Sequence, residues 1–66
     1  MQHGTVVRRY SDGKWLEYVW IEPWGKWIRH AKRGHGYKII ERLSDGELRA
    51  RGKFAKVYDP DFGELR

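Results

Sequence analysis

Positively charged side chains recur in the second half of the chain, within two strand-like runs, residues 37–43 and 48–54, that flank Ser44-Asp45-Gly46-Glu47. A hairpin of these runs sets Leu43 opposite Leu48. On one face of such a hairpin the cations could bind phosphates, arginine through paired hydrogen bonds and lysine as a point charge. Alternation along the two runs brings five candidate nucleic-acid-binding residues onto that face: Lys38, Arg42, Arg49, Arg51 and Lys53.

The Asp45-Gly46 pair is the reason for predicting a hairpin, because glycine accepts the positive φ that a tight turn requires. In this register Arg42 faces Arg49, and Lys38 faces Lys53. Like charges directly opposite each other destabilise a sheet. We therefore expect an anionic partner, nucleic acid, to meet this face. The alternative is a solvated outer face whose lysines discourage pairing with other sheets.

A second basic segment, residues 31–36, is predicted to be a flexible loop rich in glycine. Glycines let backbone N–H groups approach a phosphate closely. The alternative is a plain connector between two strands. The candidate binding residues in and before this loop are Arg29, Lys32, Arg33 and His35.

Tryptophans supply the second kind of candidate contact, since stacking on a base contributes about 1–3 kcal/mol. Trp24 lies at the tip of the predicted turn Glu22-Pro23-Trp24-Gly25 and is expected to be exposed. Trp27 is a second candidate for stacking on a base, and it could equally well be a core residue. Trp15 and Trp20 are expected to be core residues.

The sequence gives little support to catalysis or to metal binding. His3, His30 and His35 have no ligand spacing, and there is no cysteine, so we expect no metal, no cofactor and no enzyme activity. Glu41 is the one acidic residue on the apolar side of the predicted hairpin. It could form a salt bridge with Arg8 or Arg29, or act as a general base beside His30 in a small nuclease.

Composition indicates a single small basic domain, residues 1–66, with residues 1–3 and 59–66 as loose termini. The chain carries a formal charge of +5 and a pI near 9.8, which is typical of nucleic-acid binders. The chain has ten aromatic residues, four Trp, four Tyr and two Phe; some of them supply the mass of the core in place of disulfides, and the rest are available for contact. No apolar run has the length of a membrane helix, and no hydrophobic stretch follows Met1, so we expect no secretory signal. We expect a cytoplasmic protein without a membrane partner.

Turn signals recur about every 10–15 residues, and β-branched and aromatic residues fill the segments between them. We predict strands at residues 5–10, 14–22, 26–31, 37–43 and 48–54, the last continuing to 58 past a bulge. A two-residue Asp12-Gly13 turn pairs Tyr10 with Trp15 and Arg8 with Glu17. The tail has three alternatives: a turn, a helical turn from Asp59-Pro60, or a sixth strand at residues 64–66. The predicted fold is an all-β antiparallel meander curled into an SH3-like barrel or, alternatively, an OB-like barrel.

The segment Tyr10-Ser11-Asp12-Gly13-Lys14-Trp15 resembles the Tyr-x-Asp-Gly-x-Trp/Tyr hairpin of Tudor-type SH3-like domains. The resemblance covers six residues of 66 and assigns no family.

These features together predict a small protein that binds DNA or RNA through a basic strand pair and exposed tryptophans. The alternative belongs to a different class: a protein-interaction module, such as a small accessory or inhibitory protein, anchored by Trp24 and Trp27. Trp, Tyr and Arg are also the hot-spot residues of protein interfaces. Salt dependence separates the two, because phosphate contacts weaken steeply with salt and apolar anchors do not.

Overall fold

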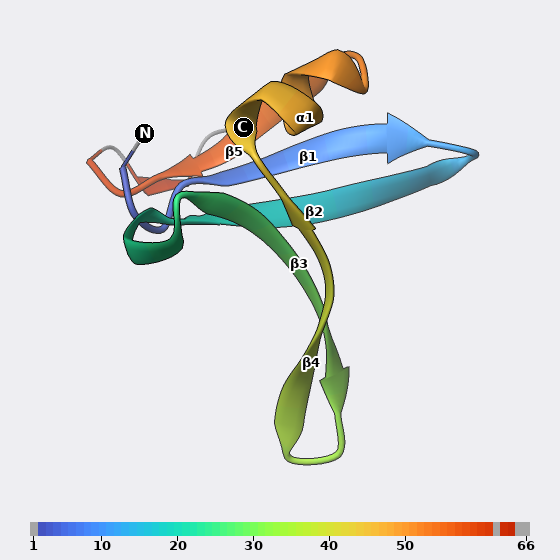
Figure 1. The fold of residues 1–66 in the computed structure, drawn as a ribbon, viewed down its shortest axis with the longest axis vertical. Coiled ribbons are helices and arrows are strands. Elements are labelled where there is room, and N and C mark those ends of the chain that lie inside the picture. The colour runs from blue at the N-terminus through green and yellow to red at the C-terminus, as the bar shows by residue number, and fades with distance from the viewer. Residues whose placement is uncertain (1, 62, 65–66) are drawn as a thin grey trace.

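The computed structural model describes residues 2–61 and 63–64, which form one antiparallel sheet and one short helix. The sheet has six strands in the order β4-β3-β2-β1-β5-β6 (Figure 1). Every pairing between neighbouring strands is antiparallel. In chain order the elements are β1 (Val6–Ser11), β2 (Lys14–Ile21), the 3-10 helix η1 (Glu22–Trp24), β3 (Lys26–Arg33), β4 (Gly36–Leu43), α1 (Asp45–Ala50), β5 (Phe54–Asp59) and β6 (Gly63–Glu64).

The first hairpin forms as predicted. Asp12 and Gly13 both have positive φ, 49° and 78°, as a type I′ turn requires. Tyr10 therefore pairs with Trp15. Arg8 pairs with Glu17, and its Nε lies 3.0 Å from Glu17 Oε2.

The second predicted hairpin, residues 37–54, is wrong. Asp45 to Ala50 form the helix α1, and Ser44 caps its N-terminus. The Ser44 Oγ accepts a hydrogen bond from Glu47 N, and Glu47 Oε1 accepts one from Ser44 N, at 3.1 and 2.9 Å. This reciprocal capping box satisfies two backbone donors at the start of the helix. Gly46 consequently has no positive φ, and no turn forms there.

The charge repulsion inferred from that hairpin is therefore absent. Arg42 pairs with Ile28 and Lys38 with Ala31, so neither faces a like charge. Arg49 lies on the helix and Lys53 precedes β5. Leu43 and Leu48 do meet in the core, but Leu48 reaches it from the helix.

The all-β class and the antiparallel sheet are confirmed, whereas a closed barrel is not. After the helix the chain crosses to the far side of the sheet, where β5 pairs with β1 and not with β4. Only β1 to β4 follow a meander, and β4 and β6 are the two edges of the sheet as far as it is described.

The sheet has a covered face and an open face. The covered face carries the core and packs against α1 through Leu48; the other buried residues of this cluster are Val7, Tyr18, Trp20, Trp27 and Leu43. The open face is traced by pairing across the strands, because paired residues share a face. Tyr10 pairs with Trp15, and further along the same face Val19 meets Ile28, which in turn meets Arg42.

The distal half of the β3–β4 hairpin, residues 30–40, projects from this body and is called the arm (Figure 1). The radius of gyration, 11.8 Å, exceeds the value of about 11 Å expected for a compact domain of this length.

The prediction of a flexible loop at residues 31–36 is wrong, because β3 and β4 continue to the turn Gly34-His35. Gly34 has a φ of 57°, at the position where a type II′ turn places glycine.

Three smaller features complete the chain. The predicted turn at Glu22 to Gly25 is a 3-10 helix with Pro23 in its first turn. Of the sixth strand predicted at 64–66, only Glu64 falls within the described residues, where it forms β6 with Gly63. Within residues 2–61 and 63–64, no helix has the length and apolarity to cross a membrane.

Candidate nucleic-acid interface

The arm is a two-stranded basic ribbon with no buried residue. Between 30 and 40 every residue is exposed except Ala31 and Ile39, which are half-buried. This stretch contains no Asp or Glu. Among the carboxylates that the structure describes, none forms an ion pair with a cation of the arm. The arm carries four of the predicted site residues, Lys32, Arg33, His35 and Lys38, together with His30 and Tyr37.

Cross-strand pairs fix the direction of these side chains. Lys32 lies opposite Tyr37, which is 70% exposed. The His30 ring meets Tyr37 edge to face, with 4.9 Å between centroids. Alternation along β3 places His30 and Lys32 on the open face with Ile28, and Arg33 on the opposite side. The arm thus presents cations on both of its sides and an aromatic ring among them.

A hollow of about 330 Å³ lies at the base of the arm, lined by Trp24, Lys26 and Arg42. Trp24 is 57% exposed, as predicted, because η1 holds it at the end of a turn. Arg42 and Lys26 belong to the open face through their pairing with Ile28 and Ile21. An aromatic ring beside two cations can hold a base next to its phosphate.

Three of the predicted binding arginines are engaged on the covered side instead. The Arg29 Nε lies 3.2 Å from Glu41 Oε1, and the Arg51 Nη1 lies 2.6 Å from Glu41 Oε2. Arg49 on α1 reaches Asp45 at 2.8 Å, and its guanidinium lies 5.6 Å from the centre of the Phe54 ring. The predicted five-cation face is therefore divided: only Lys38, Arg42 and Lys53 form no ion pair with any carboxylate described.

Of the two alternatives for Trp27, the core is confirmed, and its candidacy as a stacking residue is not. Its side chain is fully buried, and its Nε1 donates a hydrogen bond to Asp45 Oδ1 at 3.0 Å. It also packs edge to face on Trp20, with 5.2 Å between ring centroids. The hydrogen bonds from Arg49 and then from Trp27 hold the pKa of Asp45 below its ordinary value. Trp27 thus joins the sheet to the helix.

Glu41 is the centre of a polar cluster on the covered face. Besides the two arginines it accepts a hydrogen bond from Tyr18 Oη at 2.6 Å. Burial raises the pKa of Glu41, but the hydrogen bonds from Tyr18, Arg51 and Arg29 outweigh it and hold the pKa below its ordinary value. Of the two predicted salt bridges the one with Arg29 is confirmed, since Arg8 pairs with Glu17. A carboxylate with a lowered pKa is a weak general base.

Two candidate contact residues escaped the sequence interpretation because their face was misjudged. Trp15 was expected in the core but is 64% exposed, as is its partner Tyr10 at 58%. The signal was present in the pairing of Arg8 with Glu17: a residue two positions from this ion pair on β2 shares its face. Trp20, on the other face, is buried as expected.

The part of the chain that the structure describes contains no group of three or more His, Cys, Asp or Glu side chains placed to hold a metal ion. In comparisons with known proteins, no family model matches the chain, and neither does any curated protein or solved structure.

Proposed function

We propose that the protein binds nucleic acid through the arm and the adjoining open face of the sheet. The observation that carries the proposal is the arm itself: a ribbon of residues 30–40 with exposed cations, no carboxylate and no contribution to the core. An isolated two-stranded hairpin is only marginally stable, so folding gains little from extending the sheet in this way. Exposed projections of a rigid scaffold are where binding residues are commonly found.

The dimensions and charge of the arm suit a polyanion. A two-stranded ribbon fits the major groove of a duplex or lies along a single strand. Lys32, Arg33 and Lys38 would contact phosphates, and Arg42 with Lys26 would continue the contacts at the base of the arm. The net charge of +5 would speed the encounter with the ligand.

An SH3-like curling of the sheet stays part of the proposal. The register shift between Val6 and Val7 in the pairing of β1 with β5 supports it, because a bulge bends a strand and increases its twist. Binding through the arm does not depend on closure of a barrel.

A protein-interaction module is the second candidate, favoured by exposed apolar side chains beside the open face and on the arm. Trp24 and Ile40 are both at least half exposed. Such residues anchor protein interfaces as well as bases. Binding that hardly changes with salt would favour this candidate.

The test is a series of affinities against salt concentration for duplex DNA, single-stranded DNA and RNA. The double variant Lys32→Gln, Arg33→Gln is compared with the charge-matched control Arg49→Gln, Lys56→Gln, whose cations form ion pairs with Asp45 and Asp59. We expect the arm variant to flatten the plot of log affinity against log salt by about 0.7–0.9 for each phosphate that it no longer neutralises. The control should keep the wild-type slope. Absence of binding to all three ligands at about 50 mM salt would refute the proposal.

A further inference from the structure

The most exposed tryptophan of the described chain, Trp15, lies at the end of the open face farthest along β2 from the arm, paired with Tyr10. Their ring centroids are 5.2 Å apart and their planes meet at 69°. Packing of the two rings supports the first hairpin, yet it leaves both residues more than half exposed. Phosphate binding by the arm does not account for the exposure of these two aromatic side chains.

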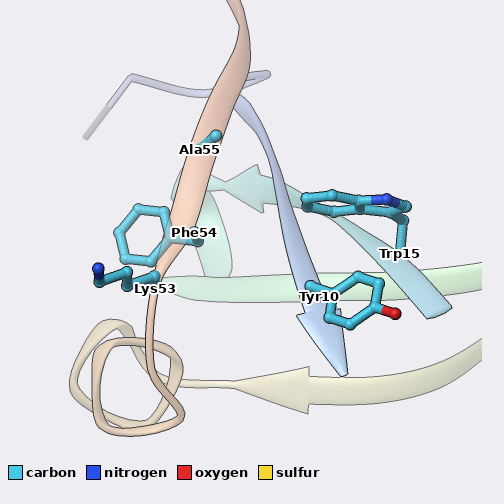
Figure 2. A pocket seen from close by; sticks show the side chains of 5 residues that line it. All are labelled: Tyr10, Trp15, Lys53, Phe54 and Ala55. Carbon is cyan, nitrogen blue, oxygen red and sulfur yellow. The ribbon is translucent and has the colours of Figure 1, made fainter. Parts of the chain in front are cut away.

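Two hollows flank the Trp15 ring. One, of about 210 Å³, is lined by Tyr10, Lys53, Phe54, Ala55 and Trp15 itself. In Figure 2, Tyr10 and Trp15 stand on one side of this hollow, and β5 with Ala55 passes on the other, while the Phe54 ring extends away from the pair. The second hollow, of about 200 Å³, lies among Arg8, Ala55, Val57 and Trp15.

Ala55 makes these hollows possible. It lies opposite Arg8 in the pairing of β5 with β1, and it lines both hollows. Its short side chain leaves space beside the Trp15 ring. Each hollow is smaller than the about 300–1,000 Å³ of a pocket for a drug-sized molecule, so each suits a single flat group.

We infer that the ligand is a single-stranded nucleic acid, and that one of its bases stacks on Trp15 in the hollow beside Tyr10 and Ala55. This inference rests on the proposed function, since it assigns the strandedness of the ligand that the arm binds. Bases within a duplex are stacked on each other and cannot reach a protein ring, whereas the bases of a single strand can.

Charge and continuity both favour this occupant. The strand pairings put Trp15 on the same face as Lys26 and Arg42, and alternation along β3 extends that face to Lys32. A strand held at the base of the arm can therefore continue along β2 to Trp15, whereas the Trp24 hollow lies toward the other end of β2, where Lys26 pairs with Ile21. Lys53, at the rim of the hollow beside Tyr10, forms no ion pair with any described carboxylate and can meet a phosphate there.

The test compares two strands that carry the same phosphates, one with bases and one made entirely of abasic sites. About ten nucleotides suffice, because the molecule is 30 Å long and a strand advances about 3.4 Å per nucleotide. A duplex of the same length is the third ligand. We expect wild type to bind the strand with bases at least about 5-fold more tightly than the abasic strand, since stacking of one base corresponds to a ratio of about 5 to 150. This comparison needs no variant.

Two variants then locate the base. Trp15→Leu removes the ring, and Ala55→Ile fills the hollows while keeping both aromatic rings. Each should reduce the preference for the strand with bases about 5- to 150-fold, the contribution of one stacked base, and leave affinity for the abasic strand unchanged. Tyr58→Leu, an exposed aromatic residue that lines neither hollow, is the control and should keep the preference.

The outcomes separate this inference from the proposed function. Equal affinity of wild type for both strands would overturn base stacking and leave phosphate binding by the arm intact. A preference that Trp15→Leu and Ala55→Ile do not change would overturn the site. Tighter binding of the duplex than of the strand with bases would overturn single-strand selection. If no ligand binds at all, both the inference and the proposed function fail.

Discussion

On the covered face of the sheet three arginines meet carboxylates, whereas on the open face most cations face solvent. Arg29 and Arg51 share Glu41, and Arg49 reaches Asp45. On the open side and along the arm, Lys32 and Arg42 have no ion pair with the carboxylates described. The same residue types thus hold the fold together on one side and remain available for a ligand on the other. Changes to the covered face should alter stability, and changes to the open face should alter binding.

The largest effect on stability is expected from Leu48→Ala. Leu48 is fully buried and joins α1 to the sheet, so its truncation should lower the free energy of unfolding by about 2–5 kcal/mol. Ile40 is a half-exposed residue of the arm, so Ile40→Ala should change the free energy of unfolding by less than about 0.5 kcal/mol. Urea melts of the two variants measure the difference. Similar losses in both would mean that the two faces are not distinct.

The second effect is the response of the Glu41 cluster to acid. The folded pKa of Glu41 lies below its ordinary value of 4.5, so the unfolded chain takes up the proton first as the pH falls. The contribution of Glu41 to stability is therefore complete above that value and is lost as the pH falls through the folded pKa. Asp45 and Glu47, whose pKa values are also lowered, act with the same sign.

Glu41→Gln should lower the free energy of unfolding at neutral pH by about 1–3 kcal/mol and make it less dependent on pH in the acid range. The matched change on the open face is Glu17→Gln, which removes an exposed ion pair with Arg8 and should cost less than about 1 kcal/mol. Melts at several pH values below neutrality measure both. An unchanged acid response in Glu41→Gln would contradict the role given to the cluster.

The two Ser-Asp-Gly triplets show what the sequence could and could not predict. Residues 11–13 form a hairpin turn, as predicted, with a register that holds for every pair. Residues 44–46 begin a helix. The deciding residue is the next one, since Glu47 can accept the hydrogen bond from Ser44 N in a capping box, whereas Lys14 has no acceptor. Both signals were present at 44–47, and the hairpin interpretation neglected the second.

This distinction gives the third prediction. Glu47→Lys makes the second tetrapeptide identical to the first and should lower the free energy of unfolding by about 0.5–2 kcal/mol through loss of the cap. Lys14→Glu, the reciprocal change in the first turn, should have little effect, because Asp12 and Gly13 already have the positive φ of the hairpin. Helix content from circular dichroism, together with melts, checks both. A loss of stability in Lys14→Glu as large as in Glu47→Lys would contradict the explanation.

Which face of a strand is covered was the other point that the sequence left undecided. Alternation along β2 correctly placed Trp15 and Trp20 on opposite faces. Both faces of this strand carry apolar side chains, so the pattern did not say which face is covered by the core. The position of α1 decides it, because Leu48 packs with Trp20 and Trp27. The candidate site changed accordingly: Trp27 leaves it, while Trp15 and Tyr10 join it. Tyr37 joins it as part of the arm, and Lys26 as part of the Trp24 hollow.

The smallest effect is expected at Arg9, a charged side chain of the covered face that is only 6% exposed. Its Nη1 donates to the carbonyl of Arg51 at 3.3 Å, while its Nε has no hydrogen-bond partner. A buried charge without a carboxylate is costly, and an apolar residue of similar length often replaces it without loss. Arg9→Met should therefore leave the free energy of unfolding within about 1 kcal/mol of wild type or raise it. A loss above about 3 kcal/mol would mean that the hydrogen bond from Arg9 to Arg51 stabilises the fold by more than the burial of the Arg9 charge costs.

The central claim is that a ligand meets the open face and the arm, and not the covered face. A nuclear magnetic resonance titration of the isotope-labelled protein with a short single strand of nucleic acid tests this claim most directly. The four tryptophans provide indole N–H signals on both faces. We predict that the signals of Trp15 and Trp24, and the amides of the arm, shift with added ligand, while those of Trp20, Trp27 and the amides of α1 stay in place. Shifts confined to α1 and the buried tryptophans, or no shift at saturating ligand, would contradict the account.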